Sequence, residues 1–204
     1  MLAFAVTALV IELTPGPNLA YLAILSATEG RRAGFAAVLG IAVGLLVVGL
    51  AAALGLTAII MTSRWLYQLL RWGGILYLLW LAWAGWRGEP DTPAGAVTSA
   101  PSRSKFFLQG LTTNLLNPKA GLFYIAVLPE FVDQTKPVIS QAAMLSVIYV
   151  AIATSVHSTI VALAGATRPW LEQGHREIVA RRVLSLLLAV IAVWLFTATR
   201  FKAQ

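Results

Sequence analysis

The chain has 204 residues, of which 59% are hydrophobic and 11% charged, with a formal net charge of +7 and no cysteine. Its mean hydropathy of +0.80 lies outside the range of soluble domains and indicates a polytopic membrane protein. The basic residues lie between long apolar segments instead of on one polar face, which argues against a nucleic-acid partner, and the lack of cysteine excludes thiol chemistry and disulfides.

Six apolar segments are each long enough to cross the roughly 30 Å core of a lipid bilayer as a helix of about 20 residues. We predict membrane spans at residues 2–28, 34–61, 65–86, 106–132, 138–166 and 181–200. The Pro-, Gly- and Ser-rich stretch 88–104 predicts a mobile loop between two three-helix halves, residues 1–87 and 105–204. Because three is odd, the second half enters the membrane from the opposite face. The sequence therefore predicts a single all-α membrane domain, 1–204, built from two inverted-topology repeats.

A short segment of the first span recurs in the fourth. Leu13–Leu25 aligns without a gap on Leu116–Leu128 at a constant offset of 103 residues, and each copy carries a proline, Pro15 or Pro118. Proline removes a backbone donor and clashes with the preceding turn, so helices 1 and 4 are expected to break near the bilayer midplane. Two broken helices at corresponding positions are typical of a transporter's substrate site, whereas one proline alone is more often a structural kink.

A new helix starts after each break, and its N-terminus offers free N–H groups and partial positive charge to an anion such as the carboxylate of an amino acid. Lys119 follows the second proline directly, and asparagines accompany both breaks. The predicted substrate-binding residues are Pro15, Gly16, Pro17, Asn18, Asn114, Asn117, Pro118 and Lys119.

Three ionisable residues inside apolar spans are candidates for proton coupling, because a charge in mid-membrane costs about 2.5–3.5 kcal/mol and needs a partner or a role. They are Glu12, one turn before the first break, Lys119, and His157 in the fifth span. The alternatives are a static Glu12–Lys119 ion pair, a snorkelling lysine and a packing role for His157. His157 and His175 lie far apart in the sequence, without the spacing of metal ligands, so we predict no metal site and no cofactor. The sequence also lacks a cluster of catalytic groups, so we do not predict an enzyme.

The segments 13–18 and 114–132 resemble the LysE/RhtB family of bacterial amino-acid exporters, and the length, six spans and polar central loop match as well. The resemblance to these LeuE/RhtB-like translocators implies a secondary exporter of amino acids or close derivatives, driven by the proton motive force across the bacterial inner membrane. It implies a place in the translocation path for Pro15, Gly16, Pro17, Asn18, Asn117, Pro118 and Lys119. Glu12 departs from the family, in which we expect a small or apolar residue at this position.

The distribution of Lys and Arg predicts the orientation of the chain. Nine of them fall at the loops of one face and five at the other, so the positive-inside rule places the first face in the cytoplasm and both termini outside. Gly40 and Gly44 permit close helix contact, either within one bundle or in a homodimer. We predict alternating access around a midplane amino-acid site, and the alternatives are an exporter or flippase of lipidic or glycolipid cargo, a membrane-embedded enzyme and a gated pore.

Overall fold

The computed structural model describes residues 1–14, 16–55, 63–87, 103–133, 135–171 and scattered positions between 179 and 193. Every regular element within these residues is a helix, which confirms the all-α fold class. The elements are α1 (Leu2–Leu13), α2 (Pro17–Glu29), α3 (Arg31–Ala53), α5 (Arg64–Arg87), α6 (Arg103–Leu115), α7 (Pro118–Leu122), η1 (Phe123–Val127), η2 (Leu128–Phe131), α8 (Val138–Ala166) and α9 (Arg168–Leu171).

Two of the described helices, α3 and α8, are long and apolar enough to cross a membrane, and α1 with α2 forms a third candidate span that is bent by 58°. The predicted second span, 34–61, is longer than α3, because Leu54 leaves the helix and Gly55 takes a positive φ of 77° that terminates it. Residues 56–62 and most of the predicted span 181–200 lie outside the described residues.

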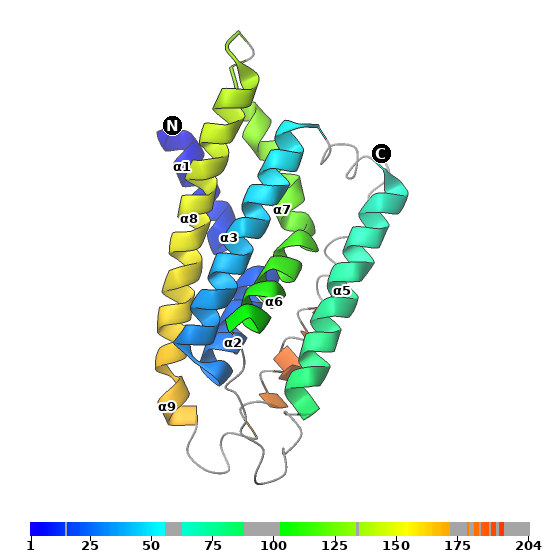
Figure 1. Ribbon diagram of the computed structural model, residues 1–204, viewed down its shortest axis with the longest axis vertical. Helices are drawn as coiled ribbons and strands as arrows, with labels where there is room; N and C mark the ends of the chain where they lie inside the picture. The colour runs from blue at the N-terminus through cyan, green and yellow to red at the C-terminus, as the bar shows by residue number, and fades with distance from the viewer. Residues whose placement is uncertain are drawn as a thin grey trace.

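The helices run alternately along the long axis of the molecule (Figure 1). α1 and α2 descend from the N-terminus, α3 returns, α5 descends, α6 and α7 ascend, and α8 descends again. α3 packs against both α6 and α8, and α8 packs in turn against α1 and α2. The core thus lies along α3 and α8, and the broken segments pack on either side of this pair.

The crossing of α3 and α6 depends on two glycines. A side chain on Gly40 would meet the Phe107 carbonyl oxygen, and one on Gly110 would meet that of Ala37, so each helix presents bare backbone to the other. This close approach is the use of small residues in membrane helix packing. Gly40 therefore serves packing within one bundle, while the homodimer stays a prediction.

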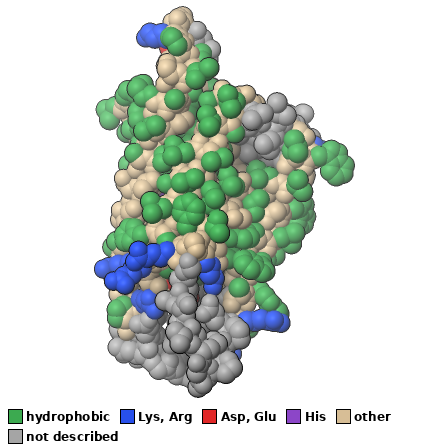
Figure 2. Space-filling model, in the orientation of Figure 1, with side chains coloured by type: hydrophobic (Ala, Val, Ile, Leu, Met, Phe, Trp, Pro, Cys, Tyr) green, Lys and Arg blue, Asp and Glu red, His purple; other side chains and the backbone are tan. Residues whose placement is uncertain are grey.

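The surface of the helical bundle is apolar along its sides (Figure 2). Exposed large hydrophobic residues include Leu39 and Leu50 on α3, Trp80 on α5 and Val147 on α8. Lys and Arg side chains gather instead toward the end of the molecule where α3 begins and α5 ends, with a further group at the opposite tip (Figures 1 and 2). An apolar band between two polar ends is the pattern expected of a protein that crosses a bilayer.

The loop predicted at 88–104 is too long at its C-terminal end. Residues 88–102 lie outside the described part of the chain, but Arg103 and Ser104 already belong to α6. Phe106 in the first turn of α6 is buried in the core, and fixing this ring draws the preceding polar residues into the helix.

Candidate functional site

The first span is interrupted between α1 and α2. Thr14 and Gly16 have extended backbones, with φ and ψ of −66° and 126° for Thr14 and −166° and 176° for Gly16. Pro17 occupies the first turn of α2, where its missing N–H costs nothing because no carbonyl is available to it. Pro15 itself lies outside the described residues. The interruption occurs where the sequence predicts it.

The segment predicted as the fourth span, 106–132, is interrupted between α6 and α7, again at the predicted position. Asn117 is extended, with φ −90° and ψ 106°, and its side-chain oxygen accepts a hydrogen bond of 3.0 Å from the backbone N–H of Lys119. This bond satisfies one of the free donors at the start of α7, which opens with Pro118. The chain then continues through a π-helical segment, η1, in which the Tyr124 hydroxyl donates to the Leu45 carbonyl at 3.0 Å.

Two hydrogen bonds bring the interruptions together across the two halves of the sequence. The Asn18 side-chain amide donates to the Asn114 side-chain oxygen at 2.9 Å, and both residues are buried. The Lys119 ammonium donates to the Thr14 carbonyl at 2.8 Å, so this cation lies against the C-terminal end of α1. Cations are favoured at that end of a helix by the unpaired carbonyls and the macrodipole.

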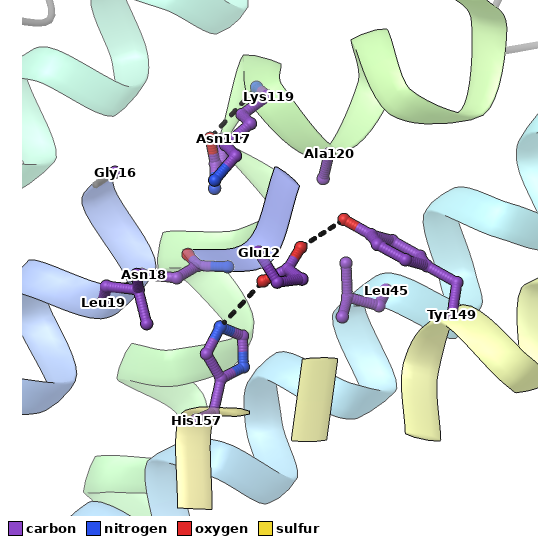
Figure 3. A pocket seen from close by; sticks show the side chains of 10 residues that line it. All are labelled: Glu12, Gly16, Asn18, Leu19, Leu45, Asn117, Lys119, Ala120, Tyr149 and His157. Atoms are coloured by element: carbon purple, nitrogen blue, oxygen red, sulfur yellow. Dashed lines mark hydrogen bonds and ion pairs between the residues drawn. The ribbon is translucent and has the colours of Figure 1, made fainter. Parts of the chain in front are cut away.

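Glu12 forms the centre of a buried cluster between α1 and α8 (Figure 3). The Tyr149 hydroxyl donates to Oε1 of Glu12 at 2.5 Å, and Nε2 of His157 lies 3.3 Å from Oε2. All three side chains are less than 9% exposed. The structure thus gives Glu12 and Lys119 different partners, His157 and Tyr149 for the carboxylate and Thr14 for the ammonium, in place of the direct ion pair considered from the sequence.

Tyr149 is a member of this cluster that the sequence did not indicate. The available signal was a hydroxyl-bearing aromatic residue two helical turns before His157 within the same apolar span. Because the ring of Tyr149 stacks on Phe123 with centroids 3.7 Å apart, its hydroxyl has a fixed position relative to η1.

The two interruptions and the Glu12 cluster surround one small cavity, which has room for about one water molecule. Its described lining residues are Glu12, Gly16, Asn18, Leu19, Leu45, Asn117, Lys119, Ala120, Tyr149 and His157. Of the other predicted residues, Asn114 lies behind Asn18, and Pro17 and Pro118 start the helices whose N-termini flank the cavity. Six predicted residues thus share one cavity, and the sequence did not indicate Leu19, Leu45, Ala120 or Tyr149.

Several buried polar atoms around this cavity have no hydrogen-bond partner among the described residues. They include Oδ1 of Asn18, Nδ2 of Asn114 and Nδ1 of His157. An unsatisfied buried polar group costs about 1–3 kcal/mol, so such a cluster fits a site that takes up water or a ligand. Among the described residues, no three His, Asp or Glu side chains lie close enough together to hold a metal ion.

Comparison with known proteins identifies the family. A family model described as LysE type translocator matches residues 9–199, and the chain belongs to this family. The homoserine/homoserine lactone efflux protein of Salmonella typhimurium is 24% identical over 170 residues, covering 83% of this chain and 82% of the relative. The threonine efflux protein of Escherichia coli K12 is 35% identical over 136 residues, covering 64% and 66% of the two chains. The leucine efflux protein of Klebsiella pneumoniae is 32% identical over 133 residues, covering 65% and 63%. No solved structure matches the chain.

Proposed function

We propose that this member of the LysE type translocator family exports amino acids or small amino-acid derivatives across the bacterial cytoplasmic membrane. The observation that carries the proposal is the meeting of two interrupted helices around one buried cavity that contains both a carboxylate, Glu12, and an ammonium, Lys119. Relatives named as threonine, leucine and homoserine efflux proteins support the substrate class.

The substrate carboxylate binds at the start of α2 beside Lys119. The first N–H groups of this helix have no intrahelical acceptor, and they add partial positive charge to that of the lysine. Asn18 and Asn117 complete the contacts, since both line the cavity with side-chain amides. Binding the carboxylate by helix dipoles and a lysine compensates for its loss of hydration in the membrane interior.

Transport proceeds by alternating access, with the two halves rocking as inverted repeats around the cavity. The packing supports this mechanism, because α3 of the first half contacts α6, α7 and η1, and its counterpart α8 contacts α1 and α2. A cavity with room for about one water is too small for an amino acid, so the halves must separate for loading and release.

The proton motive force drives export, and the proton-coupling candidates are Glu12, Lys119 and His157. All three line the substrate cavity, Glu12 and His157 buried and Lys119 half-buried, which supports coupling because a proton and a substrate then act on the same charges. The Arg-rich end of the molecule faces the cytoplasm by the positive-inside rule, which puts both termini outside. Oriented in this way, the chain carries substrate outward across the inner membrane.

Efflux from proteoliposomes tests the proposal. Purified protein is reconstituted and loaded with radiolabelled threonine, leucine, homoserine or homoserine lactone, and efflux is followed with and without a proton gradient. Lys119→Ala is expected to abolish efflux of the transported amino acid, whereas Lys136→Ala, an exposed lysine in the loop before α8, is expected to leave it unchanged. Absence of gradient-dependent efflux for all four compounds would reject the proposal and leave lipidic cargo as the next candidate.

A further inference from the structure

Glu12 is the acidic member of the substrate cavity, and its carboxylate is only partly used by the protein. Among the described lining residues it alone is an Asp or Glu, and it lies 6% exposed. A carboxylate offers about four acceptor positions. Tyr149 takes one on Oε1 and His157 lies against Oε2, which leaves acceptor capacity on both oxygens.

A second unused acceptor lies in the same cavity. Asn18 donates its amide to Asn114, and this bond orients its own Oδ1, which has no hydrogen-bond partner among the described residues and is 93% buried with the rest of its side chain. Asn18 and Glu12 come from opposite sides of the first helix break and both line the cavity (Figure 3). The remaining acceptor positions of the Glu12 carboxylate suit a group that only donates hydrogen bonds, and an ammonium with three N–H donors is such a group.

We infer that Glu12 binds the α-ammonium group of the substrate, and that this cavity therefore selects compounds with a free amino group. The inference rests on the proposed export of amino acids and adds a second recognition point to it. Lys119 and the start of α2 hold the carboxylate at one side of the cavity, and Glu12 holds the ammonium at the other. Tyr149 acts as a positioning residue that holds the carboxylate of Glu12 from α8 by a hydrogen bond, and His157 of the same helix lies beside the other carboxylate oxygen.

Two other roles for Glu12 make different predictions. As a structural counter-charge to Lys119, Glu12 would support binding of every ligand of the cavity to the same extent. As a proton carrier only, it would be needed for gradient-driven transport and not for exchange of substrate at equal pH. An ammonium receptor is instead needed for exchange itself, and only for ligands that carry a free amino group.

Counterflow at equal internal and external pH separates these roles. We compare four reconstituted proteins: wild type, Glu12→Gln, Glu12→Asp and Tyr149→Phe. The first measurement is the half-saturation concentration of radiolabelled threonine in counterflow. The second is inhibition of that counterflow by homoserine lactone, which has an ammonium and no carboxylate, and by N-acetylthreonine, which has a carboxylate and no ammonium. Glu130→Gln on the exposed η2 segment is the matched control. Size-exclusion profiles in detergent check that each variant is folded.

We expect Glu12→Gln to raise the half-saturation for threonine and the inhibitory concentration of homoserine lactone by about 30-fold or more, since a buried charge loses its partner. Inhibition by N-acetylthreonine should not weaken, Glu12→Asp should restore part of the threonine binding, and Glu130→Gln should match wild type. Where Glu12→Gln fails to fold, Tyr149→Phe is expected to give the same pattern with a smaller change. Equal weakening toward all three ligands, or unchanged threonine counterflow, would overturn the inference. Wild type that does not exchange threonine, and that also gives no efflux of leucine, homoserine or homoserine lactone, would instead reject the proposed function.

Discussion

Polar side chains buried in apolar helices decide how the two interruptions meet. The Asn18–Asn114 bond joins residues 96 positions apart, and the contact between Lys119 and Thr14 joins the same two regions on the other side. Each of these groups would be costly in hydrocarbon without a partner. These hydrogen bonds therefore fix one relative placement of the broken helices. Substitutions of the two partners of a bond should show a coupling energy.

The Asn18–Asn114 pair is expected to show a coupling energy in a double-mutant cycle. Asn114→Ala removes the acceptor and leaves a buried donor on Asn18, which should lower the free energy of unfolding by about 1–3 kcal/mol. In the double variant Asn18→Ala with Asn114→Ala no donor is stranded, and a coupling of about 0.6–1.7 kcal/mol should be recovered. Chemical unfolding of the purified protein in detergent measures the four stabilities. Strictly additive losses would show that the bond does not link the two breaks.

The sequence could predict that polar residues from the two breaks lie close together, but not every residue that lines the cavity or how the polar groups pair. The repeated prolines place Asn18, Asn117 and Lys119 at equivalent breaks, and the structure puts all three around one cavity. The sequence could not predict that Glu12 faces Tyr149 and His157, because that contact depends on the rotation of α8 about its axis. In a helix that is apolar on nearly all sides, hydrophobic periodicity does not fix that rotation.

At the scale of the helices, proline and glycine set where each segment begins and how closely it packs. Pro17 and Pro118 start helices, which their fixed φ favours, and these positions can be read from the sequence. The π-helical turns of η1 cannot be read from the sequence, because no residue type marks a wide helical turn. Their stability comes from tertiary contacts, in which Tyr124 bonds to the Leu45 carbonyl and Phe123 stacks on Tyr149.

Two Gly→Ala substitutions, one at the crossing of α3 and α6 and one on α5, are expected to have different outcomes. The added methyl of Gly40→Ala would overlap the Phe107 carbonyl and lie 2.8 Å from the Leu111 amide nitrogen, both backbone atoms that cannot move alone. We expect a loss of about 1–3 kcal/mol in stability. Among the described residues, the added methyl of Gly73→Ala on α5 would meet only the Leu116 side chain, at 3.4 Å. The higher helix propensity of alanine should therefore leave stability unchanged or slightly higher. Thermal unfolding in one detergent compares the two variants. Equal unfolding midpoints for Gly40→Ala and Gly73→Ala would show that α3 and α6 accommodate the added methyl without loss of stability.

At the scale of the whole molecule, the two ends differ in how they are closed. At the N-terminal end of α1, Phe4 is fully buried and packs edge-on against Phe131 with ring centroids 5.3 Å apart. At the Arg-rich end, arginines cross between the halves and bind main-chain carbonyls. The ends of the molecule therefore differ in chemistry, with packed aromatic rings at one and arginine contacts to main-chain carbonyls at the other.

The orientation of the molecule can be tested directly, because the chain contains no cysteine. Lys136→Cys in the loop before α8 is expected to react in intact cells with a membrane-impermeant maleimide, since that end should face outward. Arg32→Cys at the start of α3 should react only after the membrane is permeabilised. Both positions are exposed in the structure, so a difference in labelling reports sidedness and not burial. The reverse pattern would invert the topology derived from the basic residues.

Two arginines at the Arg-rich end, Arg31 and Arg168, each donate hydrogen bonds to a main-chain carbonyl of the other half of the sequence, and we call this pair the latch. Its removal should favour opening at this end. Arg31 at the start of α3 donates from Nε and Nη2 to the Ala162 carbonyl of α8, at 3.1 and 3.0 Å, while Arg168 of the second half donates to the Glu29 carbonyl at the end of α2, at 2.6 Å. In the proposed alternating access the halves separate at this end, and that separation would break both contacts. If each exposed contact contributes about 0.5–1 kcal/mol to the closed state, the double substitution Arg31→Ala with Arg168→Ala shifts the closed-to-open ratio by about 5- to 30-fold.

Labelling of a cysteine in the cavity measures that shift. Leu19→Cys lines the cavity and is half-buried, so its reaction with maleimide in inside-out vesicles reports access from the Arg-rich end. The latch variant should label faster than the parent by a factor close to the population shift, and Arg32→Ala, an exposed arginine beside Arg31, should label like the parent. An equal increase in both variants would assign the effect to the loss of surface charge. No increase in either would mean that the apolar contacts of α2 and α3 with α8, and not the arginines, hold this end closed.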